Sequence, residues 1–522
     1  MIAFVLAGLL LLAPAPPQSR ETGKQAPGEP ADPVAEAAAW RKRFVSPKVV
    51  ADAASQREVE RIVADLRMLQ VAVPERRAEV FFALLDLATL LPRRPASRAA
   101  WETPDPREIA VELAFAALER GLEIYRDADL GGWIARELLA RPDLHSVERR
   151  RAALDLLAGK RPQSALLGIL SCSLDPAPEI REAAMRALVG WDDESVHAWM
   201  VARLAEARGT PSWTAMNLAR QHFSGVQLPE GSPGSKALFE FLREDLFAED
   251  WRTATRALQL LPPVEHGLAM PALIEALSLW QSRSDVGRGS RRIEGEIHAA
   301  LKKRSRANVG PFPDLWALWW KAHAAEMGTG GVTPDEAQVT RAAFFGLRPI
   351  TDRVTFILDR SGSMNGSFGG QGTRFGEAIR QMMGFLQSLG PRTRFRLVLF
   401  DDALHVWKDS LQPATRDNLE SVEIWAGYQK PDGGTMLRQA VERVLRLKPD
   451  GKIDLKRLEE DTVIVLCDGA TTDGTLWVEP LMERIGLQAC VVFHCVQLGG
   501  EGNGTLEALA RCTGGEYRQV DG

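Results

Sequence analysis

Several side chains with oxygen donors lie where apolar segments of the chain end. Asp359 and Asp468 each directly follow an apolar run that is typical of a buried strand, and hydroxyl and glycine residues surround both. A hard divalent cation prefers about six oxygen ligands in an octahedral arrangement. We expect a cation site with an open sixth position and these ligands: Asp359, Ser361, Ser363, Thr435 and Asp468.

Alternating strands and helices must position these residues. The expected strands are residues 354–358, 395–400, 462–467 and 490–496, with a last strand near Tyr517. The expected helices are residues 374–389, 436–447, 476–485 and a segment from Thr505. This alternation predicts an α/β doubly wound fold, a mostly parallel sheet with helices on both faces. Ligands bind such sheets at the carboxyl ends of the strands, so Asp359 and Asp468 should face one crevice.

The pattern Asp-x-Ser-x-Ser, followed by a distant Thr and a distant Asp, resembles the metal-ion-dependent adhesion site of von Willebrand factor A (VWA) domains. The resemblance covers residues 352–522 and matches all five ligand positions. It implies a Rossmann-like VWA fold in which both serines and the threonine coordinate directly, and the aspartates directly or through water. It also implies Mg²⁺ as the cation, with Mn²⁺ or Ca²⁺ as alternatives, and a carboxylate of a protein partner as the sixth ligand.

Residues around the motif allow further expectations. Asp401 and Asp402 end the second expected strand, where they are either supporting partners of the site or surface turn residues. Residues 366–372 are rich in glycine and predict a larger or mobile rim. They do not form a dinucleotide-binding loop, because Phe375 occupies the third glycine position of that motif. Asp473 is expected to be solvent-exposed.

The middle of the chain, residues 38–327, predicts an all-helical domain. Its apolar residues recur at intervals of three and four, with short breaks that contain proline and glycine. The clearest helix begins after Asp175 and Pro176, and its apolar stripe is Ile180, Ala183, Ala184, Ala187 and Leu188. Similar stripes near residues 152–157 and 254–258 resemble HEAT repeats, which implies a solenoid. A non-repetitive helical domain is the alternative.

The end of this helical region has two further features. Trp316, Trp319 and Trp320 are spaced as on one helix face and are expected to close the helical core rather than to form a ligand cage. Residues 328–351 are expected to be a linker with a short helix that opens at Thr333 with a capping box.

The amino-terminal segment predicts export. Residues 1–15 contain an apolar run with a small-residue exit, typical of a signal peptide, or else of a short uncleaved anchor. Residues 16–37 are rich in Pro, Gly, Glu and Ala and are expected to be a disordered linker. We therefore expect a periplasmic, envelope-associated or secreted protein.

Charge and cysteine content exclude some classes of protein. A net charge of −5, from 64 basic and 69 acidic residues, argues against binding to nucleic acid over the whole chain. The 5 cysteines have no C-x-x-C spacing for zinc or redox chemistry. In an exported chain, Cys495 and Cys512 are the candidate disulfide pair.

These features predict a metal-dependent protein-binding adaptor and not an enzyme. The chain has no Walker phosphate loop, no G-x-S-x-G elbow and no H-E-x-x-H motif, so we expect no catalytic residue and no organic cofactor. The VWA domain is expected to hold an acidic side chain of a protein, and the helical scaffold to offer a second surface. The alternatives are a non-catalytic subunit of an ATPase or chelatase complex and a structural solenoid with an unused metal site.

Overall fold

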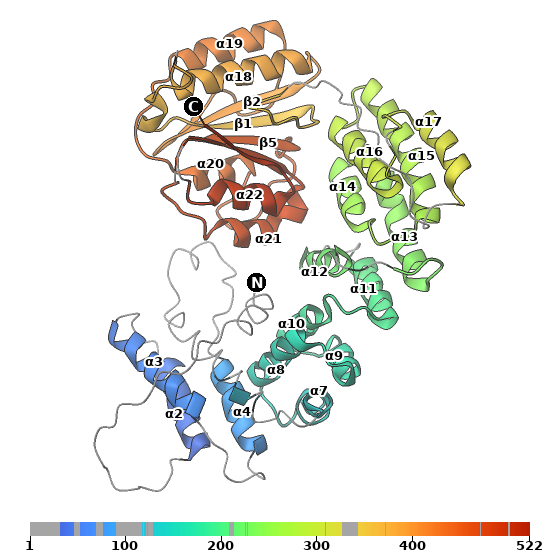
Figure 1. Ribbon diagram of the computed structural model, residues 1–522, viewed down its shortest axis with the longest axis vertical. Coiled ribbons are helices and arrows are strands. Elements are labelled where there is room, and N and C mark those ends of the chain that lie inside the picture. Colours follow the sequence, from blue (N-terminus) through green and yellow to red (C-terminus); the bar gives the residue numbers. More distant parts are fainter. Residues whose placement is uncertain are drawn as a thin grey trace. The chain divides into compact units, whose positions relative to one another are not determined.

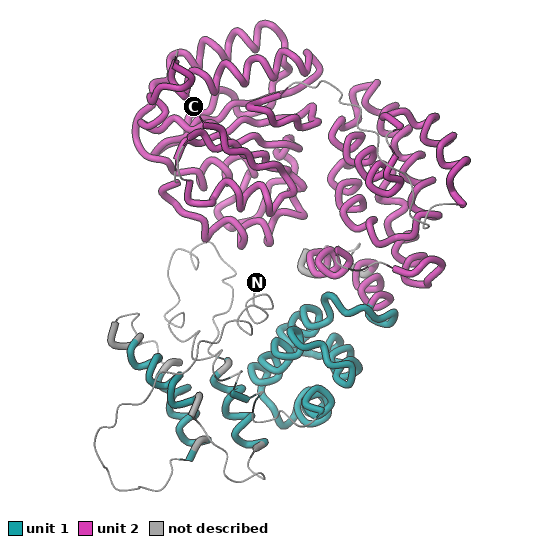
Figure 2. Tube along the Cα trace, in the orientation of Figure 1, with its two compact units in different colours: residues 1–196 teal, residues 197–522 magenta. Residues whose placement is uncertain are grey.

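The computed structural model describes most of the chain beyond its amino terminus. The described residues are 32–45, 53–68, 77–89, 117, 120, 121, 123, 129–207, 213–224, 226, 228–307, 309–325, 343–370, 372–469, 471–499 and 502–521. They form two compact units, residues 1–196 and residues 197–522 (Figure 2).

The described part of the first unit consists of helices and turns. Its elements are α2 (Pro33–Val45), α3 (Ala53–Met68), α4 (Arg77–Ala88), α7 (Leu130–Ile134), η3 (Ala135–Leu139), α8 (Val147–Lys160), η4 (Gln163–Ala165), α9 (Leu166–Cys172), α10 (Pro178–Leu188) and the start of α11 (Glu194–Ala207). The predicted linker, residues 16–37, therefore ends too late, because α2 already begins at Pro33. Proline is well tolerated in the first turn of a helix, where its missing amide hydrogen is not needed.

The α10 helix has the buried stripe that the sequence predicts. Its five stripe residues are all buried, and Pro178 stands in its first turn. The guanidinium of Arg150, on α8, donates to the Asp175 carboxylate at 2.5 Å, and the amide of Ala177 donates to the same carboxylate at 2.9 Å. Asp175 thus ties the start of α10 to α8, against which α10 packs.

The second unit begins with more helices and ends with the sheet. These helices are α12 (Trp213–Ser224), α13 (Pro233–Leu246), α14 (Trp251–Leu260), α15 (His266–Asp285), α16 (Arg291–Ser305) and α17 (Pro313–His323). Trp316 is fully buried and its indole N–H donates to the carbonyl of Gly310 at 2.7 Å, which confirms its role in the core. Trp319 and Trp320 are only half-buried. The helix expected at Thr333 lies outside the described residues.

The sheet is mixed but mostly parallel. Its strands are β1 (Arg353–Asp359), β2 (Arg394–Phe400), β3 (Leu404–Val406), β4 (Gln412–Pro413), β5 (Thr462–Cys467), β6 (Val492–Leu498) and β7 (Tyr517–Val520). The order is β3-β2-β1-β5-β6-β7, with β4 also paired to β2. The neighbours from β2 to β7 run parallel, and β3 and β4 are antiparallel to β2.

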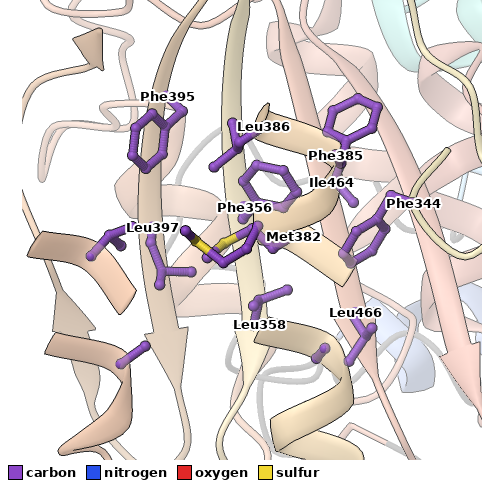
Figure 3. Close-up of a cluster of buried hydrophobic side chains, with 14 of the residues drawn as sticks. Phe344, Phe356, Leu358, Met382, Phe385, Leu386, Phe395, Leu397, Ile464 and Leu466 are labelled. Atoms are coloured by element: carbon purple, nitrogen blue, oxygen red, sulfur yellow. The ribbon is translucent and has the colours of Figure 1, made fainter. Parts of the chain in front are cut away.

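Helices cover both faces of this sheet (Figure 1). One face carries α18 (Arg374–Leu389) and α19 (Arg416–Gly427), and the other carries α20 (Leu437–Val444), α21 (Val478–Ala489) and α22 (Thr505–Thr513). Beneath α18, Phe356 and Leu358 of β1 pack with Met382 and Phe385 (Figure 3). Every second residue of β1 faces this cluster because side chains alternate along a strand. The doubly wound α/β architecture is therefore confirmed.

The helices of the second unit bond to the amino-terminal edge of the sheet. The buried guanidinium of Arg292, on α16, donates to the carbonyls of Asp461 at 2.6 Å and of Cys490 at 2.5 Å. These carbonyls stand just before β5 and β6. Arg353, at the start of β1, donates in turn to the carbonyl of Gly289 at 3.2 Å. The carboxyl ends of the strands lie at the opposite edge.

These contacts explain why the division into units differs from the boundary that the sequence suggests. The chain divides after Val196, inside α11, and not within residues 328–351. Side chains of α12 and α14 add to the same junction, since Asn217 and Arg256 donate to carbonyls of α21 at 2.6 and 3.2 Å. The later helices therefore form one compact unit with the sheet.

The described residues bear only in part on the predicted export of the protein and on its candidate disulfide. None of the described helices is both long and apolar enough to cross a membrane. The predicted signal segment, residues 1–15, lies outside the described residues. All 5 cysteines are free, so the candidate pair of Cys495 and Cys512 is not bonded.

Candidate metal centre

Asp359 and Asp468 meet at the carboxyl edge of the sheet. Asp359 is the last residue of β1, and Asp468 directly follows β5. The two strands are parallel neighbours, with Leu358 paired to Leu466, so both carboxylates leave the sheet at the same edge. The side chains of both are buried. The predicted juxtaposition is confirmed.

The Asp359 carboxylate is fully buried and lacks a basic partner among the described residues. One oxygen accepts from the Ser361 amide at 2.7 Å, and the other accepts from the Cys467 thiol at 3.0 Å. Burial raises the pKa of Asp359, and the nearby charge of Asp468 raises it further. A thiol is a weak donor, so a bound cation would stabilise this carboxylate far more than its present partners do.

The two serine hydroxyls connect the aspartates. Ser361 Oγ lies 3.0 Å from Ser363 Oγ, and Ser363 Oγ donates to Asp468 Oδ1 at 2.7 Å. A short 3₁₀ turn, Gly362–Asn365, follows Ser361 and brings the second hydroxyl back over the sheet edge. The chain thus gathers hydroxyl and carboxylate oxygens of the kind that Mg²⁺ prefers.

Thr435 enters the site from the loop before α20. Its amide donates to Thr472 Oγ1 at 3.3 Å, and its carbonyl accepts from the Thr472 amide at 2.9 Å. The next amide, of Met436, donates to the Asp401 carbonyl at 3.0 Å. Thr435 therefore lies between the loops that follow β2 and β5, and it is partly exposed.

Two glycines before Thr435 lie against an aspartate that supports the loop. The Gly434 amide donates to Asp402 Oδ2 at 2.9 Å. A Cβ added to Gly433 or Gly434 would stand 2.7 or 2.5 Å from an Asp402 oxygen, closer than real contacts allow, and Gly433 also has a positive φ of 75°. Asp402 is therefore a supporting partner of the site, one of the two interpretations that the sequence left open.

Arg360 joins three loops beneath the site. Its guanidinium pairs with Asp401 and donates to the Lys430 carbonyl at 3.0 Å. Burial alone would raise the pKa of Asp401, but hydrogen bonds from the Ala403 amide and from Arg360 outweigh it and lower that pKa. Asp401 thus stays ionised and holds Arg360 rather than a cation.

Arg374 is a site residue that the sequence analysis did not identify. Its Nη1 donates to Asp468 Oδ2 at 2.7 Å. It is the first residue of α18, and Thr373 caps that helix. The signal that could have found it is a basic residue at the start of the helix that returns over the motif.

One expectation about the rim needs correction. Asp473 is half-buried and not solvent-exposed: its carboxylate accepts from the Arg438 amide at 2.5 Å in the first turn of α20, and burial raises its pKa. The described residues of the glycine-rich segment, 366–370 and 372, form a turn in which the Phe368 amide donates to the Gly372 carbonyl at 2.8 Å. Phe368 packs on Phe345, which anchors the turn to the core.

The donor set fits a hard cation bound by hydroxyls. In the part of the chain that the structure describes, no group of three or more His, Cys, Asp and Glu side chains is arranged to hold a metal. The structure brings Asp359, Ser361, Ser363 and Asp468 into one hydrogen-bonded group, and among the described contacts the Thr435 hydroxyl makes no hydrogen bond to these four. The predicted donor set comprises two carboxylates and three hydroxyls. Such a set suits Mg²⁺ or Mn²⁺ better than a soft ion.

Comparison with known protein families identifies the sheet domain. Residues 352–519 match the family described as von Willebrand factor type A domain. Inter-alpha-trypsin inhibitor heavy chain H4 of Homo sapiens is 27% identical over 181 residues, which cover 34% of this chain and 19% of that protein. The chain thus spans about a fifth of the length of this relative.

Two solved structures are also similar to part of this chain. A von Willebrand factor type A protein from Catenulispora acidiphila is 18% identical with a TM-score of 0.28, covering 33% of this chain and 40% of its own. Proximal thread matrix protein 1 from the mussel byssus, with a zinc-occupied MIDAS motif, is 18% identical with a TM-score of 0.25, covering 32% and 40%. By the family match and the α/β sheet, residues 352–519 of this chain are a von Willebrand factor type A domain.

Proposed function

We propose that the VWA domain binds one divalent cation, Mg²⁺ in the first instance, and uses it to hold an acidic side chain of a protein partner. The ligands are Asp359, Ser361, Ser363, Thr435 and Asp468. The observation that carries the proposal is the fully buried Asp359 carboxylate, which has no basic partner among the described residues and lies beside a chain of hydroxyl oxygens. A carboxylate in that position is stable when a cation compensates it.

The charge of the ligand set favours capture of a carboxylate. Three of the five donors are neutral hydroxyls. Asp468 already forms an ion pair with Arg374, which partly neutralises its charge. The cation therefore keeps much of its positive charge. A sixth ligand from outside the chain completes an octahedron, and an acidic side chain is the ligand that such a cation attracts most strongly.

The loops around the site offer apolar contacts to a protein. Tyr428, in the loop that leads to Thr435, is 81% exposed, and Leu476, in the loop that follows Asp468, is 91% exposed. Large apolar side chains at this exposure are typical of surfaces that another protein covers. They support a protein partner over a small acidic molecule.

We assign binding and not catalysis to this site. The thiol next to the site is that of Cys467, which is buried and donates to Asp359. Burial raises the pKa of Cys467 well above the ordinary thiol value, so the reactive thiolate does not form near neutral pH. We further propose that the helices form a HEAT-like scaffold with a second interaction surface, on an exported or envelope-associated protein.

Cation titration of the chelator-treated full-length protein tests the proposal. Calorimetry should show one Mg²⁺ or Mn²⁺ bound per chain, and Asp359→Ala should abolish binding while the melting curve in chelator stays close to that of the wild type. Asp417→Ala, at an exposed position on α19, is the matched control and should bind normally. Saturating Mg²⁺, at about 100 times Kd, should stabilise the wild type by about 2.7 kcal/mol.

Partner capture with and without chelator completes this test. Capture that needs the cation and Asp359 supports the adaptor function. An unchanged cation affinity in Asp359→Ala would show that the site assignment is wrong. Capture that survives chelation points to the helical scaffold, and a co-purifying ATPase points to a subunit of an ATP-driven complex.

A further inference from the structure

We propose that Arg374 is a built-in counter-charge that keeps the resting cation affinity of the site low, so that firm cation binding depends on the carboxylate of the partner. The proposal rests on the proposed function, because it concerns the same site. It assigns to Arg374 an affinity-determining role and not that of a ligand.

The geometry places a fixed positive charge on one of the ligands. Asp468 Oδ2 accepts from Arg374 Nη1 at 2.7 Å, while Oδ1 accepts from Ser363 Oγ at 2.7 Å. The Asp468 side chain is 1% exposed and that of Arg374 is 29% exposed. The ion pair is therefore largely shielded from solvent on the carboxylate side, where screening by salt is weak.

Local structure holds Arg374 in this position. Its amide donates to the Gly366 carbonyl at 2.9 Å, which joins the start of α18 to the turn after the serine motif. On the other side, a Cβ on Gly499 would lie 3.3 Å from Arg374 Nη2, so a glycine there leaves room for the guanidinium. Gly499 also has a positive φ of 65°, which favours glycine.

The other arginines near the site have different roles. Arg360 pairs with Asp401, which is not a predicted ligand. Arg380, on the exposed side of α18, pairs with Glu377. In the described part of the chain, Arg374 is the basic side chain that pairs with one of the five predicted ligands.

Electrostatics then gives the direction of the effect. A divalent cation bound near Asp468 would lie within a few ångströms of the guanidinium, and the two positive charges repel each other. The hydrogen bond also draws part of the Asp468 charge away from the cation. Both effects weaken resting cation binding. A carboxylate from the partner restores negative charge, so partner and cation must raise each other's affinity by the same factor.

Mn²⁺ titration of the chelator-treated full-length protein, followed by calorimetry, tests this inference. Arg374→Gln should bind Mn²⁺ at least about tenfold more tightly than the wild type, because it removes the positive charge but keeps a hydrogen-bond donor. Arg374→Lys keeps the charge and should stay within about threefold of the wild type. Arg380→Gln, the matched control on the same helix, should leave Mn²⁺ affinity unchanged.

The outcomes separate this inference from the proposed function. If the wild type binds Mn²⁺ and Asp359→Ala does not, while Arg374→Gln binds equally or more weakly, the counter-charge role is overturned and the metal site stands. Tight binding by both Arg374→Gln and Arg374→Lys would also overturn it, since charge would then not be the cause. Absence of binding in both wild type and Arg374→Gln overturns the two proposals together. Melting curves in chelator verify that each variant is folded.

Discussion

The side chains of the candidate site differ in how deeply they lie. Asp359, Ser361 and Asp468 are buried, whereas Thr435 is partly exposed and Ser363 is exposed. The buried members fix where a cation sits. Ser363 and Thr435 stand on the more exposed side, where a partner would approach.

This difference predicts separable effects for Thr435→Ala. Resting Mg²⁺ affinity should fall by less than about threefold, because the other ligands remain and water can replace one hydroxyl. Partner binding should fall by about tenfold or more, because the lost hydroxyl lies on the exposed side of the site, where the partner's carboxylate would join the cation. Calorimetry with Mg²⁺ and chelator-sensitive capture of the partner measure the two quantities. If the partner binds this variant as tightly as the wild type, its binding does not depend on the threonine loop.

Sequence reasoning predicted the five ligands because each follows a recognisable strand end or belongs to a short motif. It did not find Arg374, because the ion pair with Asp468 depends on how the start of α18 crosses back over the end of β5. It also placed Asp473 in solvent, because nothing in a loop sequence shows that a carboxylate will accept from the first turn of the preceding helix. Contacts between segments that are distant in the sequence could not be predicted without the three-dimensional fold.

At the scale of the elements, the loops of the carboxyl edge form one hydrogen-bonded group. The Gly362 amide donates to the Gly433 carbonyl at 3.2 Å, and the Asp432 amide donates to the Arg360 carbonyl at 2.8 Å. Asp402 adds the contact to Gly434 from the end of β2. The threonine loop is thus positioned by the two neighbouring strand ends.

Removal of one of these contacts should loosen the loop selectively. In Asp402→Ala the Gly434 amide loses its acceptor, which costs about 1 kcal/mol and should speed hydrogen exchange in residues 430–436. Cation affinity should fall by about three- to tenfold, as expected for the loss of a residue that orients a ligand. Asp402→Asn keeps an acceptor oxygen and should behave nearly as the wild type. Equal exchange rates in Asp402→Ala and the wild type would contradict this account.

The elements that the sequence predicted best are those whose pattern reflects burial. The segment 462–467 coincides with β5, all of whose residues are buried, and the segment 374–389 coincides with α18. The short antiparallel strands β3 and β4, and the helix α19, were not predicted. Strands of two or three residues carry too few side chains to show an alternating pattern, and pairing with β2 rather than local sequence determines them.

At the scale of the whole second unit, the junction between helices and sheet contains two neighbouring acidic groups. Asp461 accepts from Thr351 Oγ1 at 2.7 Å and from Thr462 Oγ1 at 2.8 Å. Asp352 lies near it, and one of its carboxylate oxygens is buried without a hydrogen bond in the described structure. The pKa of Asp352 is raised to about 6, first by burial and then by Asp461.

This shift predicts how stability depends on pH. Folding raises the pKa of Asp352, so the folded protein keeps a proton that the unfolded chain has already lost between about pH 4 and pH 6. The free energy of unfolding should therefore fall as pH rises through that range. Asp352→Asn should remove this decrease and stabilise the protein at pH 7 by up to about 3 kcal/mol. Urea unfolding at pH 4, 5, 6 and 7 measures the free energy of unfolding. The same pH dependence in Asp352→Asn and in the wild type would contradict this explanation.

The contacts at the two ends of β1 also determine how the domain carries mechanical load. β1 begins at Arg353, which is bonded to the helical region, and ends at Asp359 in the candidate site. A pull on a ligand at the site, resisted by the helices, therefore runs lengthwise along β1. The hydrogen bonds to β2 and β5 lie across that direction and are strained together in shear, whereas a pull at right angles would break them one after another. Tension between a captured partner and the helical region thus loads the sheet in its strongest direction.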